Sequence, residues 1–364
     1  MKIFYVQPTS DTPTGGIKQA FRHVEALQSE GYDAHILLDR PSRPAWFEST
    51  ASIAYPDFRS RLSSSLRRRD KRYFWHWLRS SSVPPVVILS PAGAGGSGRG
   101  IVGKDLRHRI SPEDVLVFPE FFGSQLPLPP WPARIGIFNQ NAHYTFSDDT
   151  YDSIPRLGAG LYARAEFVLC VSDHSYDYLS YTFPQITVVK TLNGVDIDRF
   201  SSSTDKRHQI AFMPRKLGAD AIQAFNILHS RRSLEGWEIV PIDGMPEVRV
   251  AETLRHARVF LSTCEEEGFG LPPLEAAAAG CSVVGYTGYG AAEFMRPEFC
   301  KPVTQGDVLA LAKTLAEVVE EHNQLGSVPM TGSAQAHRRF VEMNYSLECQ
   351  QKSVVEAWQR VLQP

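Results

Sequence analysis

The sequence predicts an α/β protein with two Rossmann-like halves, each built on a parallel sheet. The chain opens with a strand, a glycine loop, a helix and a second strand, which together form a βαβ unit. Short apolar strands then alternate with turns and helical patterns along most of its 364 residues. A polar stretch at 201–208 separates two such series of similar size, and a chain of this length is expected to form two domains.

The first half starts with an apolar run at 2–8 that predicts a buried strand. Residues 17–30 carry apolar side chains at helical spacing, and Gly31 follows where a helix commonly ends. Residues 41–85, rich in Pro, Ser and Arg, interrupt the alternation. Further strands of this half are expected at 33–39, 86–90, 115–118, 134–138 and 167–172.

The second half repeats the alternation. Its strands are expected at 209–213, 237–242, 257–263 and 282–286. Between the last two, residues 264–270 predict a loop and residues 271–279 a short helix. A proline pair falls in the first turn of this helix, where proline is tolerated, and Gly280 follows its last residue. The chain ends in a helical pattern from about Gln335.

Composition excludes several classes of protein. A net charge of −2 gives no overall attraction to nucleic acid. The five cysteines are scattered without a C-x-x-C pair, which excludes a disulfide framework and a zinc cage of the usual spacing. The start of the chain does not read as a signal peptide, and no apolar run approaches the roughly 20 residues that span a bilayer. We therefore expect a cytoplasmic protein.

Two near-matches to nucleotide-binding motifs overlap at 93–105. The string "GAGGSG" fits G-x-G-x-x-G and follows a predicted strand, but no helical pattern opens at its third glycine. The string "GRGIVGKD" is close to a P-loop but carries Asp105 where that motif needs Ser or Thr to hold magnesium. A surface loop is the favoured interpretation of this segment, and a nucleotide loop is the alternative.

The segment 264–286 holds the residues best suited to chemistry. Its loop follows the carboxyl end of a parallel strand, where open α/β sheets bind ligands. Glu267 and Glu275 flank a Gly-Phe-Gly turn, and two carboxylates so placed suit a ligand with several hydroxyl groups, such as a sugar or ribose. A structural alternative stays open for Glu275, because we expect it in the first helical turn, where the helix dipole stabilises an acid without any function.

The string "EGFGLPPLEA", which starts at Glu267, resembles the E-x7-E signature of retaining glycosyltransferases of family 4, which have the GT-B fold. Residues 280–294, which include Glu293, are similar to the segment that follows in that family. Residues 191–200 resemble its N-G-V-D-x-x-x-F segment, and the "TGG" at 14–16 also fits. The resemblance implies an α/β GT-B architecture, in which two Rossmann-like parallel-sheet domains face a central cleft.

The same resemblance implies the domain roles. Residues 1–195 are expected to form an acceptor domain and residues 205–345 a nucleotide-sugar-binding domain. The C-terminal helix, 346–364, is expected to pack back on the first domain. No metal or other cofactor is expected.

For the donor, the resemblance implies that Glu275 binds the ribose and that Glu267 holds the sugar. The loop that assists Glu267 with its amides consists of Gly268, Phe269, Gly270 and Leu271. Arg215 and Lys216 are expected to stabilise the charge that the leaving diphosphate gains. The family usually separates these two basic residues, whereas here they are adjacent, so one of them can point elsewhere.

The acceptor side is less defined by the sequence. Gly15 and Gly16 in the first loop, and Asn139 and His143 after a predicted strand, are its candidates. His143 is equally well an ordinary loop histidine. The string "FPEFFG" at 118–123 stands in place of the histidine-containing motif of some family members.

The expected function is retaining, metal-independent transfer of a hexose-type sugar from a nucleotide-diphosphate-sugar to a glycan or lipid-linked acceptor. Two alternatives stay open. One is a catalytically silent GT-B protein that binds nucleotide-sugar or glycan. The other is a different GT-B enzyme, such as a nucleotide-sugar epimerase or a sugar phosphorylase.

The stretch Arg59–Arg79 carries eight basic residues and one acid, and Phe74, Trp75 and Trp77 lie among them. This mixture suits an anionic membrane surface, so we expect peripheral docking at the inner face of the plasma membrane. A solvated helix face is the alternative. Nucleic acid is not expected, because no recognised binding motif accompanies the charge.

Overall fold

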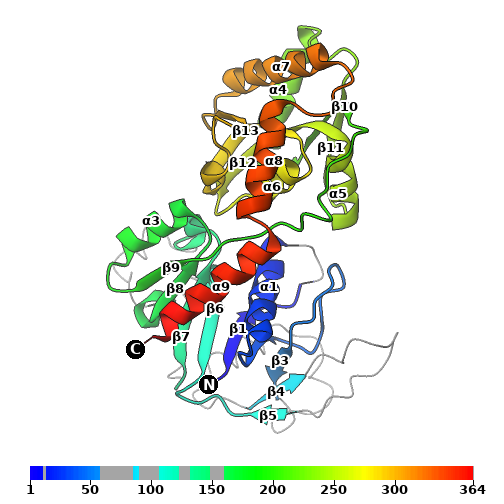
Figure 1. The fold of residues 1–364 in the computed structure, drawn as a ribbon. Helices are drawn as coiled ribbons and strands as arrows, with labels where there is room; N and C mark the ends of the chain where they lie inside the picture. Colours follow the sequence, from blue (N-terminus) through cyan, green and yellow to red (C-terminus); the bar gives the residue numbers. More distant parts are fainter. Residues whose placement is uncertain (11–13, 58–84, 90–105, 123–131, 148–159, 364) are drawn as a thin grey trace, which may run out of the picture. The chain divides into compact units, whose positions relative to one another are not determined.

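The computed structural model describes residues 1–10, 14–57, 85–89, 106–122, 132–147 and 160–363 (Figure 1). The chain divides into two compact units, and each has a sheet of its own. The N-terminal unit comprises Met1–Cys170, Tyr178–Lys190 and Gln351–Pro364, and the C-terminal unit comprises Val171–Asp177 and Thr191–Gln350.

The described strands of the N-terminal unit form one sheet in the order β5-β4-β3-β2-β1-β6-β7-β8-β9. They are β1 (Ile3–Gln7), β2 (Ala34–Leu38), β3 (Ile53–Pro56), β4 (Val86–Leu89), β5 (Leu106–His108), β6 (Val115–Pro119), β7 (Arg134–Asn139), β8 (Phe167–Cys170) and β9 (Thr187–Lys190). All neighbours pair in parallel except β3 with β4 and β4 with β5. The order reverses direction between β1 and β6, which is the switch point typical of doubly wound sheets.

Two expectations for this sheet were incomplete. Residues 41–85 were interpreted as an interruption, yet β3 lies within them, because a run of four mostly buried residues is enough to pair with β2. The strand expected at 86–90 exists as β4 but runs antiparallel to β3. Antiparallel strands are common near the edge of an otherwise parallel sheet, and short apolar runs do not reveal strand direction.

The helices of the N-terminal unit follow from the sequence pattern. Helix α1 (Gly15–Ser29) buries its apolar side, and Gly31 adopts a φ of +81° after its end, as a terminating glycine should. Helix α3 (Asp173–Thr182) runs from the short segment of the C-terminal unit into the N-terminal one.

The last helix, α9 (Leu347–Leu362), contributes to a cluster of aromatic side chains on the α1 side of the sheet. The buried Trp358 donates from Nε1 to the Tyr5 hydroxyl at 2.9 Å, and that hydroxyl lies 3.0 Å from His23 Nδ1. Burial lowers the pKa of His23 to about 3, so this histidine is a neutral core residue.

The C-terminal unit has a fully parallel sheet in the order β11-β10-β12-β13-β14. Its strands are β10 (Arg207–Phe212), β11 (Glu238–Pro241), β12 (Ala257–Glu267), β13 (Ser282–Tyr289) and β14 (Lys301–Val303). Its helices are α4 (Gly218–Ser230), α5 (Glu247–His256), α6 (Leu271–Ala278), α7 (Val308–Leu325) and α8 (Gly332–Asn344). Helix α4 packs beside α7, and the two share a core with Ile210, Val259 and Val284 of the sheet (Figure 1). The predicted class, α/β with parallel sheets, is confirmed.

The segment 264–280 differs from expectation in two ways. Residues Cys264 to Glu267 were expected in a loop, but β12 continues through them, because β13 also extends to pair Tyr289 with Glu267. Helix α6 begins at Leu271, as expected, but Glu275 is its fifth residue and therefore lies beyond the first turn in which it was expected. The dipole interpretation of Glu275 therefore weakens, since that effect is confined to the first turn.

Two sequence features lie outside the described residues. They are the basic stretch Arg59–Arg79 and the glycine loops at 93–105, and their interpretations stay predictions. In the part of the chain that is described, none of the helices combines the length and the apolar content needed to cross a bilayer.

Candidate functional site

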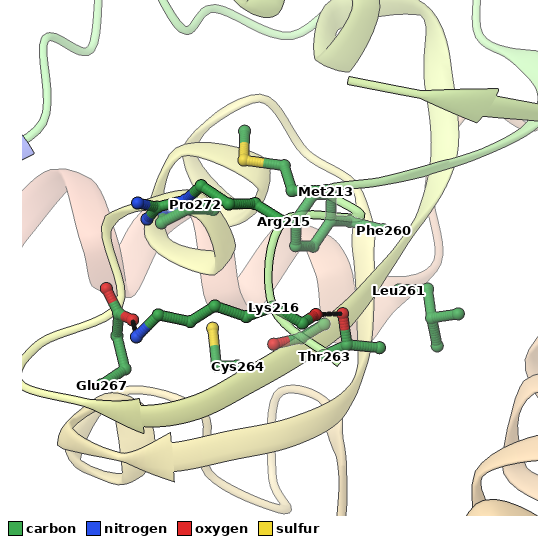
Figure 2. Close-up of a pocket in the computed structure, with 10 residues that line it drawn as sticks. Met213, Arg215, Lys216, Phe260, Leu261, Thr263, Cys264, Glu267 and Pro272 are labelled. Atoms are coloured by element: carbon green, nitrogen blue, oxygen red, sulfur yellow. Dashed lines mark hydrogen bonds and ion pairs between the residues drawn. The ribbon is translucent and has the colours of Figure 1, made fainter. Parts of the chain in front are cut away.

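A pocket in the C-terminal unit lies at the carboxyl ends of β10 and β12 (Figure 2). Its lining includes Arg215, Lys216, Thr263, Cys264, Glu267 and Pro272. The two basic residues come from the loop between β10 and α4, and the others from β12 and the start of α6. Parallel strands point their carboxyl ends to one edge of a sheet, so residues about 50 positions apart in sequence share this site.

Lys216 is fixed at both its backbone and its side chain. Its Nζ donates to the carbonyl oxygen of Glu265 at 2.9 Å and forms an ion pair with Glu267 Oε2. Its own carbonyl oxygen accepts a hydrogen bond of 2.9 Å from Thr263 Oγ1. The Lys216 and Glu267 side chains are 24% and 22% exposed, so the pair is partly screened from water and a ligand can still reach it.

Arg215 differs from its neighbour. Its side chain is exposed and has neither an ion pair nor a hydrogen bond with any residue that the structure describes. Figure 2 shows the Arg215 and Lys216 side chains extending in the same direction from their loop. Within the described part of the chain, Lys216 is therefore paired with a carboxylate and Arg215 is not. This difference suits two adjacent basic residues that have separate tasks.

Several residues around this pocket have a strained backbone conformation. Among the described residues, the non-glycine positions with positive φ are Leu217, Arg232, Glu266 and Tyr289. Leu217 follows Lys216, Glu266 precedes Glu267, and Tyr289 pairs with Glu267 across β12 and β13. Such conformations cost energy and persist mainly at functional sites.

The glycine loop after Glu267 is held by its packing. Gly270 has a φ of +91°, and a Cβ there would lie 2.8 Å from Ala291 Cβ, so only glycine fits. The Phe269 ring is 3% exposed and packs against Phe294 and Tyr345. Phe269 thus anchors the loop with its ring and can offer a ligand only its backbone.

Glu275 is half-buried on α6 and does not line this pocket. Glu293, the acid of the segment after α6, has a structural role. Its carboxylate accepts hydrogen bonds from the Asp173 backbone N–H at 2.9 Å and from the Tyr345 hydroxyl at 3.0 Å. The structure therefore brings Arg215, Lys216 and Glu267 together, and places these other two acids outside the group.

The acceptor-side candidates lie in the N-terminal unit. Gly15 and Gly16 begin α1, and the Gly16 carbonyl oxygen accepts from Gln140 Nε2 at 3.0 Å. Asn139 is fully buried and donates from Nδ2 to Thr145 Oγ1 at 3.0 Å and to the Tyr162 hydroxyl at 2.9 Å. His143 is half-buried, and its ring lies 6.2 Å from that of Tyr178.

Glu120 is a buried acid that sequence reasoning did not single out. It follows β6, is 4% exposed, and receives hydrogen bonds from the backbone N–H groups of Gln140 and Asn141. Burial nevertheless raises the pKa of its carboxyl to about 7. Its position in "FPEFFG", directly after a predicted strand, was the available signal.

Among the described residues, no group of three or more His, Cys, Asp or Glu side chains is arranged to hold a metal ion. Cys264 lines the pocket, but burial raises the pKa of its thiol to about 12, so it is not a ready nucleophile.

Comparison with known proteins points to one class. Residues 239–327 match the family model described as "Glycosyl transferases group 1". A stretch of 118 residues is 34% identical to an alpha-1,6-glucosyltransferase of Actinobacillus pleuropneumoniae serotype 7 (strain AP76). That match covers 31% of this chain and 36% of the relative, so it spans about a third of the relative's length.

Solved structures resemble the whole chain. Sucrose-phosphate synthase from Thermosynechococcus elongatus is similar with a TM-score of 0.64 and 13% identity over 99% of this chain and 98% of that one. A variant of S. aureus TarM, solved with Fondaparinux, alpha-GlcNAc-glycerol and UDP, is similar with a TM-score of 0.59 and 10% identity over all of both chains. Anabaena HepE, solved with UDP and glucose, gives 0.59 and 12% identity over 99% of this chain and all of that one. The chain therefore has the GT-B fold.

Proposed function

We propose that this protein is a retaining glycosyltransferase that moves a hexose-type sugar from a nucleotide-diphosphate-sugar to a glycan or lipid-linked acceptor. The observation that carries the proposal is the convergence of Arg215, Lys216 and Glu267 on one pocket at the carboxyl ends of β10 and β12. The match to glycosyl transferases group 1 supports it, since residues 239–327 include Glu267 and α6.

We assign the diphosphate of the donor to Arg215. This cation lines the pocket without a partner among the described residues, and the loop that carries it leads into the amino end of α4. Backbone N–H groups and a positive dipole at such an end favour phosphate. When the bond from the anomeric carbon to the diphosphate breaks, its electron pair passes to the leaving oxygen, and Arg215 stabilises that charge.

Lys216 and Glu267 act together on the sugar side of that bond. The ion pair holds the Glu267 carboxylate in one orientation, in which its remaining lone pairs can accept hydrogen bonds from sugar hydroxyl groups. Lys216 then contributes to the leaving group from a position already fixed by Glu265 and Glu267. The backbone of Phe269 and Gly270 and the carboxylate of Glu275 keep their proposed roles toward the sugar and the ribose.

Similar proteins support this donor class. TarM and HepE were solved with UDP, and the relative from Actinobacillus is an alpha-1,6-glucosyltransferase. Because common nucleotide-glucose donors are α-linked, an α-linked product corresponds to retention. The metal-free character of the reaction is part of the same proposal.

Thermal shifts with UDP, GDP, ADP and dTDP test the donor. A nucleotide at 100 times its dissociation constant should add about 2.7 kcal/mol to the free energy of unfolding. The selected nucleotide-glucose is then incubated with candidate acceptors, with and without chelator, and the anomeric configuration of the product is determined by NMR. Binding without turnover would indicate a silent binding protein, and transfer to phosphate a phosphorylase. The absence of any nucleotide shift would refute the donor assignment.

We propose in addition that Arg59–Arg79 docks the protein on anionic membranes, close to a lipid-linked acceptor. The support is its charge of +7, from eight basic residues and one acid, beside a phenylalanine and two tryptophans. Co-sedimentation with phosphatidylserine vesicles should fall steeply with salt and weaken when Arg67, Arg68 and Arg69 are changed to Ser. Indifference to such vesicles at low salt would refute it.

A further inference from the structure

Tyr289 lies at the carboxyl end of β13, directly beside Glu267 of β12 in the strand register. The glycines on either side of it pack against the same loop. A Cβ on Gly290 would lie 2.3 Å from the Gly268 carbonyl oxygen, and one on Gly288 would lie 2.9 Å from Glu267 Cβ. The turn that carries Tyr289 is therefore seated tightly on the backbone of Glu267 and Gly268.

The backbone of Tyr289 is strained. Its φ of 72° and ψ of −57° belong to a region that glycine enters readily and bulky residues enter rarely. The turn needs glycine on both sides, so a third glycine would fit it with less strain. A tyrosine in that place indicates that its side chain has a use that offsets the cost.

The Tyr289 ring is held in place and remains accessible. It stacks on His174, with the ring centres 5.1 Å apart and an angle of 20° between the planes, and the residue is 48% exposed. His174 belongs to the segment Val171–Asp177 of the same unit, and Glu293 anchors that segment by accepting from the Asp173 backbone N–H. The His174 ring thus holds the Tyr289 ring in place, and Glu293 holds the segment that carries His174.

A tyrosine paired with a glutamate across two neighbouring strands offers both kinds of contact that a hexose makes. The carbon-bound hydrogens of a pyranose form an apolar face that packs on an aromatic ring, while its hydroxyl groups bind a carboxylate at the ring's edge. We propose that Tyr289, supported by His174, forms a wall of the donor-sugar subsite and selects a sugar with an apolar face. This inference rests on the proposed function, because it assigns Glu267 to the same sugar.

The test measures how much the sugar adds to nucleotide binding. Dissociation constants for UDP and UDP-glucose are determined by calorimetry, or for the ADP, GDP or dTDP pair if the thermal shifts select that base. Tyr289→Gly removes the ring and suits the positive φ, so it should fold. It should weaken the nucleotide-glucose roughly tenfold, the worth of one aromatic contact. The affinity for the bare nucleotide should stay within about twofold.

Three further variants sharpen the result. Tyr289→Phe keeps the ring and should bind both ligands like the unaltered protein, whereas His174→Ala should lose part of the sugar's contribution. Tyr181→Ala removes a tyrosine that is 90% exposed elsewhere and should change neither constant. Equal weakening of both ligands by Tyr289→Gly, or no change in either, would overturn the inference while leaving the donor assignment intact. If the unaltered protein bound no nucleoside diphosphate, the proposed function and this inference would fall together.

Discussion

Arg215 and Lys216 are neighbours in the sequence but have different surroundings. Lys216 is held by Glu267 and by the Glu265 carbonyl oxygen, whereas Arg215 is exposed without a partner among the described residues. A cation already paired with a carboxylate attracts a new anion less strongly than an unpaired cation does, because the carboxylate cancels part of its electrostatic field. The two residues should therefore respond differently to substitution.

Arg215→Ala should weaken binding of the bare nucleoside diphosphate by roughly 1.5–3 kcal/mol, the worth of hydrogen bonds to a charged group. Lys216→Ala should weaken it less and reduce turnover more. Calorimetry and initial rates measure the two effects. Arg249→Ala, at a surface arginine whose side chain is 63% exposed, is the matched control and should change neither. Equal losses of nucleotide affinity in both variants would mean that the two cations share one task.

The Lys216–Glu267 pair should also show coupling. Lys216→Met and Glu267→Gln, made singly and together, should lower kcat/KM by less in combination than the two separate losses predict. The difference should be about 1–2 kcal/mol, since contacting residues commonly couple by 0.5–3 kcal/mol. A double-mutant cycle on kcat/KM measures it. Strict additivity would show that Lys216 does not position Glu267 during the reaction.

Two helices of the C-terminal unit end at buried cations. Lys206 donates from Nζ to the carbonyl oxygens of Leu254 and Ala257, at the end of α5. Arg258 donates to the carbonyl oxygens of His322 and Gly326, at the end of α7. Carbonyl groups at helix ends lack partners within the helix and carry partial negative charge, so each cation satisfies them.

Arg258→Met should lower the free energy of unfolding by roughly 2–4 kcal/mol, because it leaves buried carbonyl oxygens without donors. Urea unfolding monitored by tryptophan fluorescence measures the change. Arg249→Met, on the exposed side of α5, is the control and should stay within about 0.5 kcal/mol of the unaltered protein. A loss at position 258 no larger than this control would contradict the capping role.

At the scale of the whole molecule, stability should depend on pH through Glu120. Its carboxyl has a pKa of about 7 in the folded protein, against an ordinary value of 4.5. Below pH 4.5 the group is protonated in both states and costs nothing. As the pH rises toward 7 only the unfolded chain ionises, so the free energy of unfolding falls, and above about 7 the loss is complete.

Glu120→Gln should remove this dependence. Between pH 5 and pH 8 the variant should gain roughly 2–3 kcal/mol relative to the unaltered protein, in line with a pKa raised by more than two units. Urea unfolding at several pH values measures the difference, which cancels the acid effects of buried histidines such as His23. Glu113→Gln, at an exposed acid near the start of β6, should keep the original profile. Parallel profiles for all three proteins would refute the assignment.

The sequence by itself determined the fold class and three of the residues that line the pocket, Arg215, Lys216 and Glu267. Strand and helix patterns predicted α/β units with parallel sheets, because the alternation of short apolar runs with helical spacing is a local property of the chain. The glycine at 270 and the prolines after it marked the start of α6 for the same reason. Glu267 could be selected because it follows a predicted parallel strand, whose carboxyl end is a common ligand site, and Arg215 and Lys216 because the resemblance to family 4 implied a basic pair in their loop.

Only the tertiary structure decided what these residues contact. The pairing of Lys216 with Glu267, the burial of Asn139 and the raised pKa of Glu120 depend on neighbours that are distant in sequence. The antiparallel direction of β4 and the extension of β12 through Glu267 depend on strand partners. The stack of Tyr289 on His174 joins positions more than 100 residues apart. Interactions of this kind produce no periodic pattern in the sequence. Hydrogen bonds, burial and electrostatic fields depend on distances between groups in space, and only the folded chain defines those distances.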